Sequence, residues 1–98
     1  MRALAIIETG DRIICDVVAA PSYGDCISLC RYFEKYWGAT VEEDYDTGFA
    51  ARFTVKMPGR SVVLNHDSQT GNTIFSRADR VDRVISDILA DLEERLSD

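Results

Sequence analysis

The chain has 98 residues, a formal net charge of -6 at pH 7 and a hydrophobic content of 46%. A chain of this length forms one domain with one core, and its composition is that of an ordinary globular protein. The acidic balance argues against nucleic acid or an anionic membrane as partner, and no apolar run could span a bilayer. We therefore expect a single domain over residues 1–98 and, if there is a partner, a basic protein.

The first segment predicts a β-hairpin. Strands are expected over residues 2–8 and 12–19, joined at residues 9–11, where a glycine permits a tight turn. Glu8 ends the apolar start too early for a signal peptide. The Arg2–Ala19 hairpin is apolar on both faces, which leaves two explanations. It lies centrally in the sheet under helices or loops, or its second face is an interface, such as that of a homodimer.

A first helix is predicted to begin after Ser22. The Ser22 hydroxyl can cap free N–H groups, and Asp25 lies three residues further on, near the positive end of the helix dipole. Gly38 fits the position just past the helix end. Apolar residues recur along this helix at three- and four-residue spacing, which predicts one wide buried stripe. The stripe consists of Cys26, Ile27, Leu29, Cys30, Phe33, Tyr36 and Trp37.

The clearest strand is Phe49–Met57, in which apolar side chains alternate with polar ones. A period of two places alternate side chains on one face of a strand, so this face is expected to be buried. We expect this strand to lie in the middle of the sheet. Further strands are predicted over residues 39–46, 60–66 and 72–76, and their short connections favour antiparallel pairing. The apolar face consists of Phe49, Ala51, Phe53, Val55 and Met57.

The last helix is predicted to start from a cap at Ser76, with Asp79 three residues later, and to continue to Leu96. Its apolar stripe, which includes Ile85 and Leu89, requires a sheet face to cover it. The element order is therefore ββα, then a β-meander, then α. The predicted fold class is α+β, a two-layer sandwich with two helices packed on a mostly antiparallel sheet.

The most unusual local feature is the acidic stretch over residues 41–46. One interpretation is a solvated strand rim whose charge discourages edge-to-edge pairing. Another is a contact surface for a cationic partner, with an aromatic anchor among the carboxylates. A second acidic patch is expected on the last helix, at Asp87, Asp91, Glu93 and Glu94. The candidate partner-binding residues are Glu42, Glu43, Asp44, Tyr45 and Asp46.

Two further patterns resemble functional motifs only in part. The run from Asp44 to Gly48 is similar to the start of a calcium loop, but the glycine comes early and Val55 occupies the position of the closing glutamate. His66 precedes Asp67 and a serine, yet adjacent strand residues point to opposite faces, so a catalytic relay is geometrically poor. A histidine bonded within its own turn is the simpler interpretation.

The three cysteines are an odd number without a disulfide-scaffold spacing, which indicates reduced thiols in the cytoplasm. Cys15, Cys26, Cys30 and His66 supply the atoms of a zinc site, but no Cys-x₂-Cys knuckle is present. Packing as small hydrophobes is the favoured role of these thiols. A nucleophilic Cys26 is opposed by the neighbouring Asp25. We therefore expect no metal and no cofactor.

Three classes of function remain. The first is a non-enzymatic module that occludes or chaperones a basic protein partner, as toxin-immunity proteins, nuclease inhibitors and secretion chaperones of similar size, charge and layout do. The second is a dimerisation module that uses the Arg2–Ala19 hairpin. The third is a small-ligand binder or enzyme with a pocket between helix and sheet, lined by Phe33, Tyr36 and Trp37. The sequence offers no set of groups that would name a reaction.

Overall fold

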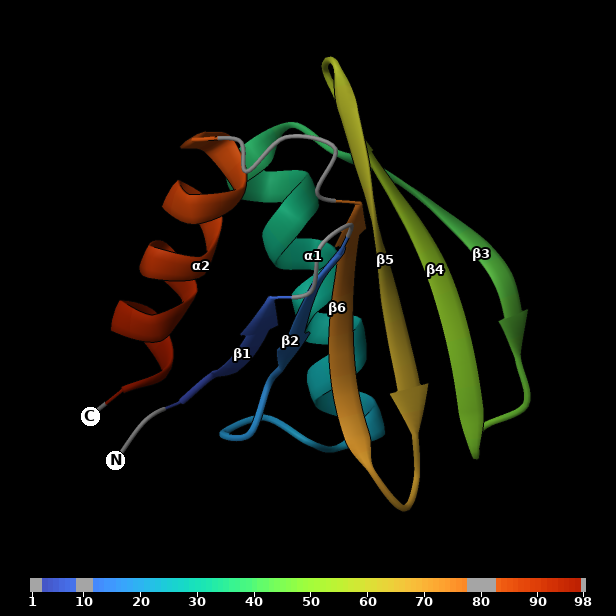
Figure 1. Ribbon diagram of the computed structural model, residues 1–98. Helices are drawn as coiled ribbons and strands as arrows, with labels where there is room; N and C mark the ends of the chain where they lie inside the picture. Colours follow the sequence, from blue (N-terminus) through green and yellow to red (C-terminus); the bar gives the residue numbers. More distant parts are fainter. Residues whose placement is uncertain (1–2, 9–11, 78–82, 98) are drawn as a thin grey trace.

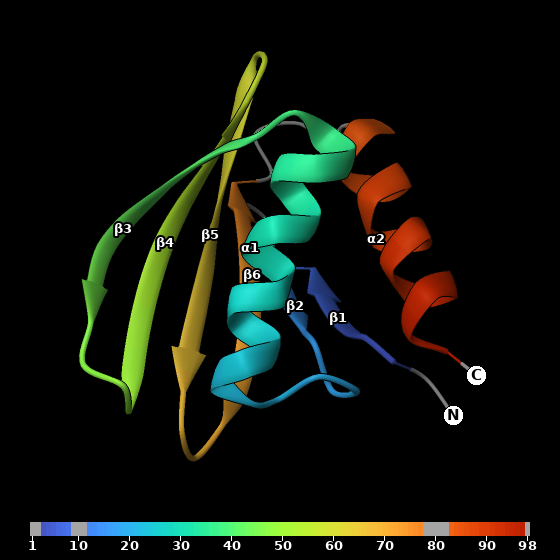
Figure 2. The same cartoon turned by 180° about the vertical axis from the view of Figure 1, so that it is seen from behind.

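The computed structural model describes residues 3–8, 12–77 and 83–97. These residues form a two-layer α+β structure in which both helices lie on the same face of one antiparallel sheet (Figures 1 and 2). The predicted fold class is confirmed. In chain order the elements are β1 (Ala5–Glu8), β2 (Arg12–Asp16), α1 (Tyr23–Trp37), β3 (Thr40–Asp46), β4 (Ala50–Met57), β5 (Arg60–Asp67), β6 (Gly71–Arg77) and α2 (Arg83–Leu96).

The strand order in the sheet is β1-β2-β6-β5-β4-β3. Strands β3 to β6 form a meander that pairs in chain order, and β2 then pairs with the free edge of β6. Because the N-terminal hairpin joins at β6, the middle of the sheet is β6 and β5. The expectation that Phe49–Met57 forms the middle strand is therefore wrong, since β4 lies next to the edge strand β3.

The alternating pattern of β4 is confirmed with one exception. Ala51, Phe53, Val55 and Met57 are buried, whereas Phe49 is 76% exposed. Phe49 precedes the strand because the backbone N–H of Thr47 donates to the carbonyl of Ala50, which closes a four-residue turn over these positions. The predicted apolar face was thus one residue too long at its start.

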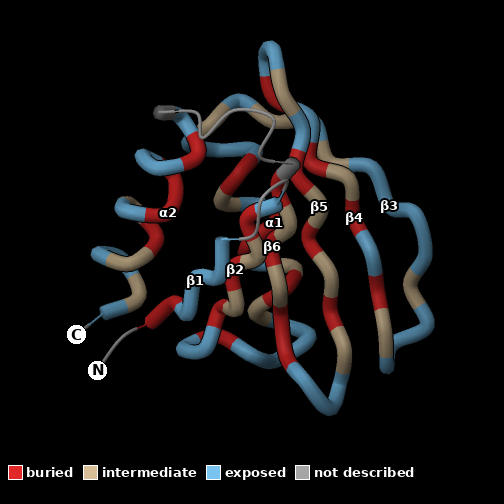
Figure 3. Tube along the Cα trace, viewed as in Figure 1, coloured by how far each residue is buried: buried red, intermediate tan, exposed pale blue. Residues whose placement is uncertain are grey.

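The N-terminal hairpin occupies an edge of the sheet. All four residues of β1 are exposed, with Ile6 at 49% and Ile7 at 59%. The central position proposed for this hairpin is therefore wrong for β1, and its two apolar faces need another explanation. In β2 the residues that face the helices, Ile13 and Cys15, are buried (Figure 3).

Helix α1 begins and ends where the sequence predicts. The Ser22 hydroxyl accepts a hydrogen bond from the backbone N–H of Asp25 at 3.0 Å, and the Asp25 carboxylate accepts one from the N–H of Ser22 at 3.1 Å. These two bonds form a capping box, which satisfies backbone donors that the helix leaves free. The helix ends at Gly38, whose φ of 63° is the left-handed conformation that glycine adopts without strain.

Helix α2 begins later than predicted. Ser76 does not cap it, because Ser76 lies in β6, is buried and pairs with Ile13 of β2. The ladder with β2 continues to Arg77, so the backbone at Ser76 is extended rather than poised to start a helix. The predicted first turn, including Asp79, lies outside the described residues. The apolar stripe of α2 is confirmed from Ile85 onward.

Candidate functional site

The five predicted partner-binding residues all lie on β3, an edge strand of the sheet. The ladder with β4 sets Glu42 opposite Thr54 and Glu43 opposite the buried Phe53, so the two glutamates point to opposite faces. A bulge between Glu43 and Tyr45 shifts the register by one residue. The structure therefore divides the acidic stretch between the two faces of the sheet.

The face without helices receives three of the five side chains. Glu42, Asp44 and Tyr45 lie there, because Tyr45 is opposite the exposed Arg52 and Asp44 accepts a hydrogen bond from the Thr54 hydroxyl at 2.9 Å. The Lys56 ammonium contacts Glu42 at 3.0 Å. An exposed ion pair of this kind contributes about 0–1 kcal/mol, so it positions Glu42 more than it stabilises the fold.

Asp46 lies on the helix side and has a structural role. Its carboxylate accepts hydrogen bonds from the Tyr23 hydroxyl and, at 2.8 Å, from the backbone N–H of Gly48. The Tyr23 bond is the main reason why the pKa of Asp46 lies below its usual value, and the same bond raises the pKa of Tyr23. Asp46 thus ties the end of β3 to the start of α1. Both carboxylate oxygens of Asp46 accept hydrogen bonds within the protein. The structure therefore gives no support to a calcium loop that begins at Asp44.

His66 belongs to a buried hydrogen-bond network that the sequence did not reveal. His66 Nδ1 lies 2.7 Å from Asn72 Oδ1, and both side chains are buried. The Asn72 amide donates to the carbonyls of Ala20 and Ser22, at 2.7 and 2.9 Å. One side chain therefore joins β5, β6 and the start of α1. The sequence did contain a sign of this network. Asn72 and Ile74 are two residues apart in β6, so the Asn72 side chain lies on the same buried face as that of Ile74.

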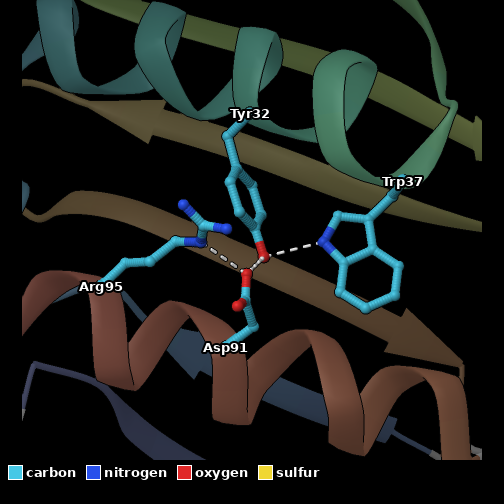
Figure 4. Close-up of polar contacts among 4 residues, drawn as sticks. All are labelled: Tyr32, Trp37, Asp91 and Arg95. Atoms are coloured by element: carbon cyan, nitrogen blue, oxygen red, sulfur yellow. Dashed lines mark hydrogen bonds and ion pairs between the residues drawn. The ribbon is translucent and has the colours of Figure 1, made fainter.

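A second polar network links the two helices (Figure 4). The Trp37 indole N–H donates to the Tyr32 hydroxyl at 2.7 Å, and that hydroxyl donates to the Asp91 carboxylate at 2.6 Å. Arg95 Nε contacts the same carboxylate at 2.7 Å, and its guanidinium lies 4.1 Å from the centre of the Tyr36 ring. Burial raises the pKa of Tyr32, whereas the Tyr32 bond lowers that of Asp91. Two residues of the predicted pocket are thus engaged between helices.

In the second predicted acidic patch, on α2, two of the four carboxylates form hydrogen bonds within the protein. Asp91 binds Tyr32 and Arg95, and the Glu93 carboxylate accepts a hydrogen bond from the backbone N–H of Ala3 at 2.9 Å. Asp87 and Glu94 remain exposed on α2. Half of this patch therefore holds the fold together, and half remains on the surface.

The candidate metal ligands and nucleophiles do not converge. All three cysteines are free and buried, and within residues 3–8, 12–77 and 83–97 no three metal-binding side chains gather. Burial raises the pKa of Cys15 to about 12, so its thiol is neutral at pH 7. A hydrogen bond from Cys30 lowers the pKa of Cys26, but the Cys26 side chain is fully enclosed. These thiols serve as core residues.

The space between the helices and the sheet is small. An apolar cavity of about 10 Å³ lies there, with Phe33 and Ile85 in its lining, and this is about the room that one water needs. Tyr36 and Trp37 do not line it. This cavity therefore gives no support to the pocket that Phe33, Tyr36 and Trp37 were predicted to line.

The opposite face of the sheet carries an apolar row. Ile7, Ile14, Phe75 and Val63 stand side by side in register across β1, β2, β6 and β5. The described helices lie on the other face, so this row is not covered by either of them (Figures 1 and 2). A hollow of about 610 Å³ adjoins it, lined by Arg12, Arg52, Ser61, Val62, Val63, Phe75 and Ser76.

Comparison with known proteins gives no further guide. No family model matches this chain, and neither a curated protein nor a solved structure matches it. Among the described residues, neither helix has the length and apolar character needed to cross a membrane. Function must therefore be argued from the surfaces themselves.

Proposed function

We propose that this protein is a non-enzymatic module that binds a basic protein partner through the acidic edge at β3, and so occludes or chaperones it. The observation that carries the proposal is the exposed position of Glu42, Glu43 and Asp44 on an edge strand, with Tyr45 44% exposed beside them. A negative surface steers a cationic partner into contact and raises the association rate.

The bulge and the charges make β3 a poor strand for backbone pairing. Both features keep an edge from adding another strand. Recognition at β3 is therefore made by side chains, with carboxylates on both faces of the strand and a tyrosine ring on the face without helices. This arrangement suits lysine and arginine side chains that reach the edge from either face.

The experiment is a comparative capture from a lysate of the source organism. The triple variant Glu42→Lys, Glu43→Lys and Asp44→Lys is expected to lose a basic protein that the native chain retains, and to bind it at least tenfold more weakly. The reason is that the electrostatic attraction between three carboxylates and a basic partner becomes repulsion. Quantitative mass spectrometry identifies the protein, and titration calorimetry at low and high salt measures its affinity.

The matched control reverses three other exposed acids, Glu34→Lys, Asp87→Lys and Glu94→Lys. Both triple variants change six units of charge, so they have the same net charge and differ only in where the charge was reversed. The control is expected to retain the partner. Equal losses in the two variants would attribute binding to net charge and reject the β3 surface.

A second candidate function, homodimerisation, is favoured by the apolar row on the open face. Two copies packed through Ile7, Ile14, Phe75 and Val63 would bury these side chains and cover the face of each sheet that carries no helices. Light scattering at micromolar concentration would then give twice the mass of one chain. Ile7→Lys would restore the single mass and Val18→Lys, at a residue 50% exposed outside the row, would not. A single mass for the native chain rejects this candidate.

A further inference from the structure

The two edges of the sheet differ in a way that bears on binding. Strand β3 carries charges and a bulge, whereas β1 consists of Ala5, Ile6, Ile7 and Glu8 and pairs only on its inner side, with β2, among the described strands. An apolar edge without proline, lysine or bulge is a template for another strand. The outer side of β1, with which no described strand pairs, is roughly 13 Å long.

A groove runs beside this edge. Helix α2 lies next to β1 in both views (Figures 1 and 2). Residues of both elements line a groove of about 500 Å³. Apolar and polar side chains both line it, and Ile6 is 49% exposed. A strand that paired with β1 would place every second side chain in this groove. The groove is lined by Leu4, Ile6, Glu8, Ile13, Ser86, Leu89, Ala90 and Glu93.

The charges in the groove specify the occupant. Glu8 lies at the end of β1, and Glu93 lies near its start because it accepts a hydrogen bond from the N–H of Ala3. Ala3 and Glu8 are five positions apart in the chain, so they are at most roughly 17 Å apart. A carboxylate at each end and apolar side chains between them complement a short segment with a cation at each end and apolar residues at alternate positions.

We propose that the groove between β1 and α2 binds an extended segment of another protein by strand addition, with apolar residues at alternate positions and lysine or arginine at both ends. Backbone hydrogen bonds to β1 supply affinity, and the groove selects the side chains. This groove is on the opposite edge of the sheet from β3. Peptide binding at the groove and protein binding at β3 can therefore be tested independently.

A second copy of the chain does not fit this edge. In an antiparallel pair of β1 strands related by a twofold axis, both helix layers lie on the same side of the joined sheet. Paired strands are about 4.8 Å apart, whereas packed helices need about 8–10 Å. Because α2 lies at the joined edge, the two copies of α2 would compete for the same space. A single strand without a helix above it avoids this collision.

The test uses a synthetic peptide in which valine alternates with threonine between terminal lysines. Calorimetry is expected to show binding to the native chain, and hydrogen exchange is expected to slow at the β1 amides. Ala90→Trp should fill the groove from an exposed position and weaken binding at least tenfold. Asp87→Trp, which also adds a tryptophan to the exposed side of α2 but does not line the groove, should leave binding unchanged.

Four outcomes would overturn the proposal. One is the absence of binding, and another is equal binding of a peptide that has glutamate in place of its lysines. The third is protection at β3 instead of β1 when the peptide binds. Equal binding by Ala90→Trp and the native chain would likewise reject this groove. Both variants that are tested with the peptide lie in α2, so failure here leaves the β3 experiment unaffected.

Discussion

Replacing Ile85 by aspartate is expected to unfold the domain. Ile85 is 4% exposed and packs in the layer between α2 and the sheet. The substitution loses about 1.5–3 kcal/mol of apolar burial and adds a buried carboxylate that costs several kcal/mol more. A domain of this size has only about 5–15 kcal/mol of stability. Circular dichroism during thermal melting should show no cooperative transition.

The neighbouring position provides the control. Val84 is 37% exposed, so Val84→Asp adds the same charge to the same helix without burying it. Its melting midpoint is expected to stay close to that of the native chain, because a surface substitution near the start of a helix is inexpensive. If Ile85→Asp melts like Val84→Asp, then α2 does not hold the sheet and the two-layer description fails.

Replacing Asn72 by leucine is expected to destabilise the protein by about 3 kcal/mol or more. The fully buried side chain of Asn72 forms hydrogen bonds with two carbonyls and with the imidazole of His66. Each buried polar group left without a partner costs about 1–3 kcal/mol. Urea unfolding, followed by fluorescence of the single tryptophan, measures this loss as a lower midpoint.

Asn65→Leu makes the same chemical change on the opposite face of the sheet. Asn65 lies in β5 opposite Thr73 and is partly exposed, so its amide does not depend on a buried partner. A change of about 0.5 kcal/mol or less is expected. Equal destabilisation by the two variants would show that the loss comes from leucine in a strand and not from the Asn72 network.

The sequence predicted the elements well because local chemistry determines them. The alternation in β4, the serine cap of α1 and the glycine after it each depend on residues within a few positions of one another. The cap of the last helix was wrongly predicted at Ser76 for the opposite reason. Ser76 looks like a helix cap locally, but its pairing with Ile13, far away in the sequence, keeps it in a strand. Such pairing cannot be read from local spacing.

Strand order was harder to predict than strand position. Nothing in the alternation of Phe49–Met57 states which strand lies beside it, and the hairpin could attach to either free edge of the meander. It attaches at β6, which places β1 at an edge and explains its exposed isoleucines. The apolar residues on both faces of that hairpin were the visible signal, and they fit an edge as well as a centre.

The sequence predicted which residues make up the acidic partner-binding site, but not how their side chains divide between the two faces of the sheet. The carboxylates of residues 42–46 do lie on an exposed edge, but the pleat sends them to two faces. Asp46 and Asp91 looked like free surface charges, yet Tyr23 and Tyr32 hold them. Those tyrosines come from α1, and only the tertiary fold brings them within reach of the carboxylates.

Cross-linking of the captured complex tests the central claim most directly. A carbodiimide joins carboxylates to lysines in contact with them, so mass spectrometry reports which acids touch the partner. The protein-binding function proposed for β3 predicts cross-links from Glu42, Glu43 and Asp44 to lysines of the partner. Cross-links confined to Asp87 and Glu94 of α2, with β3 unmodified, would contradict it.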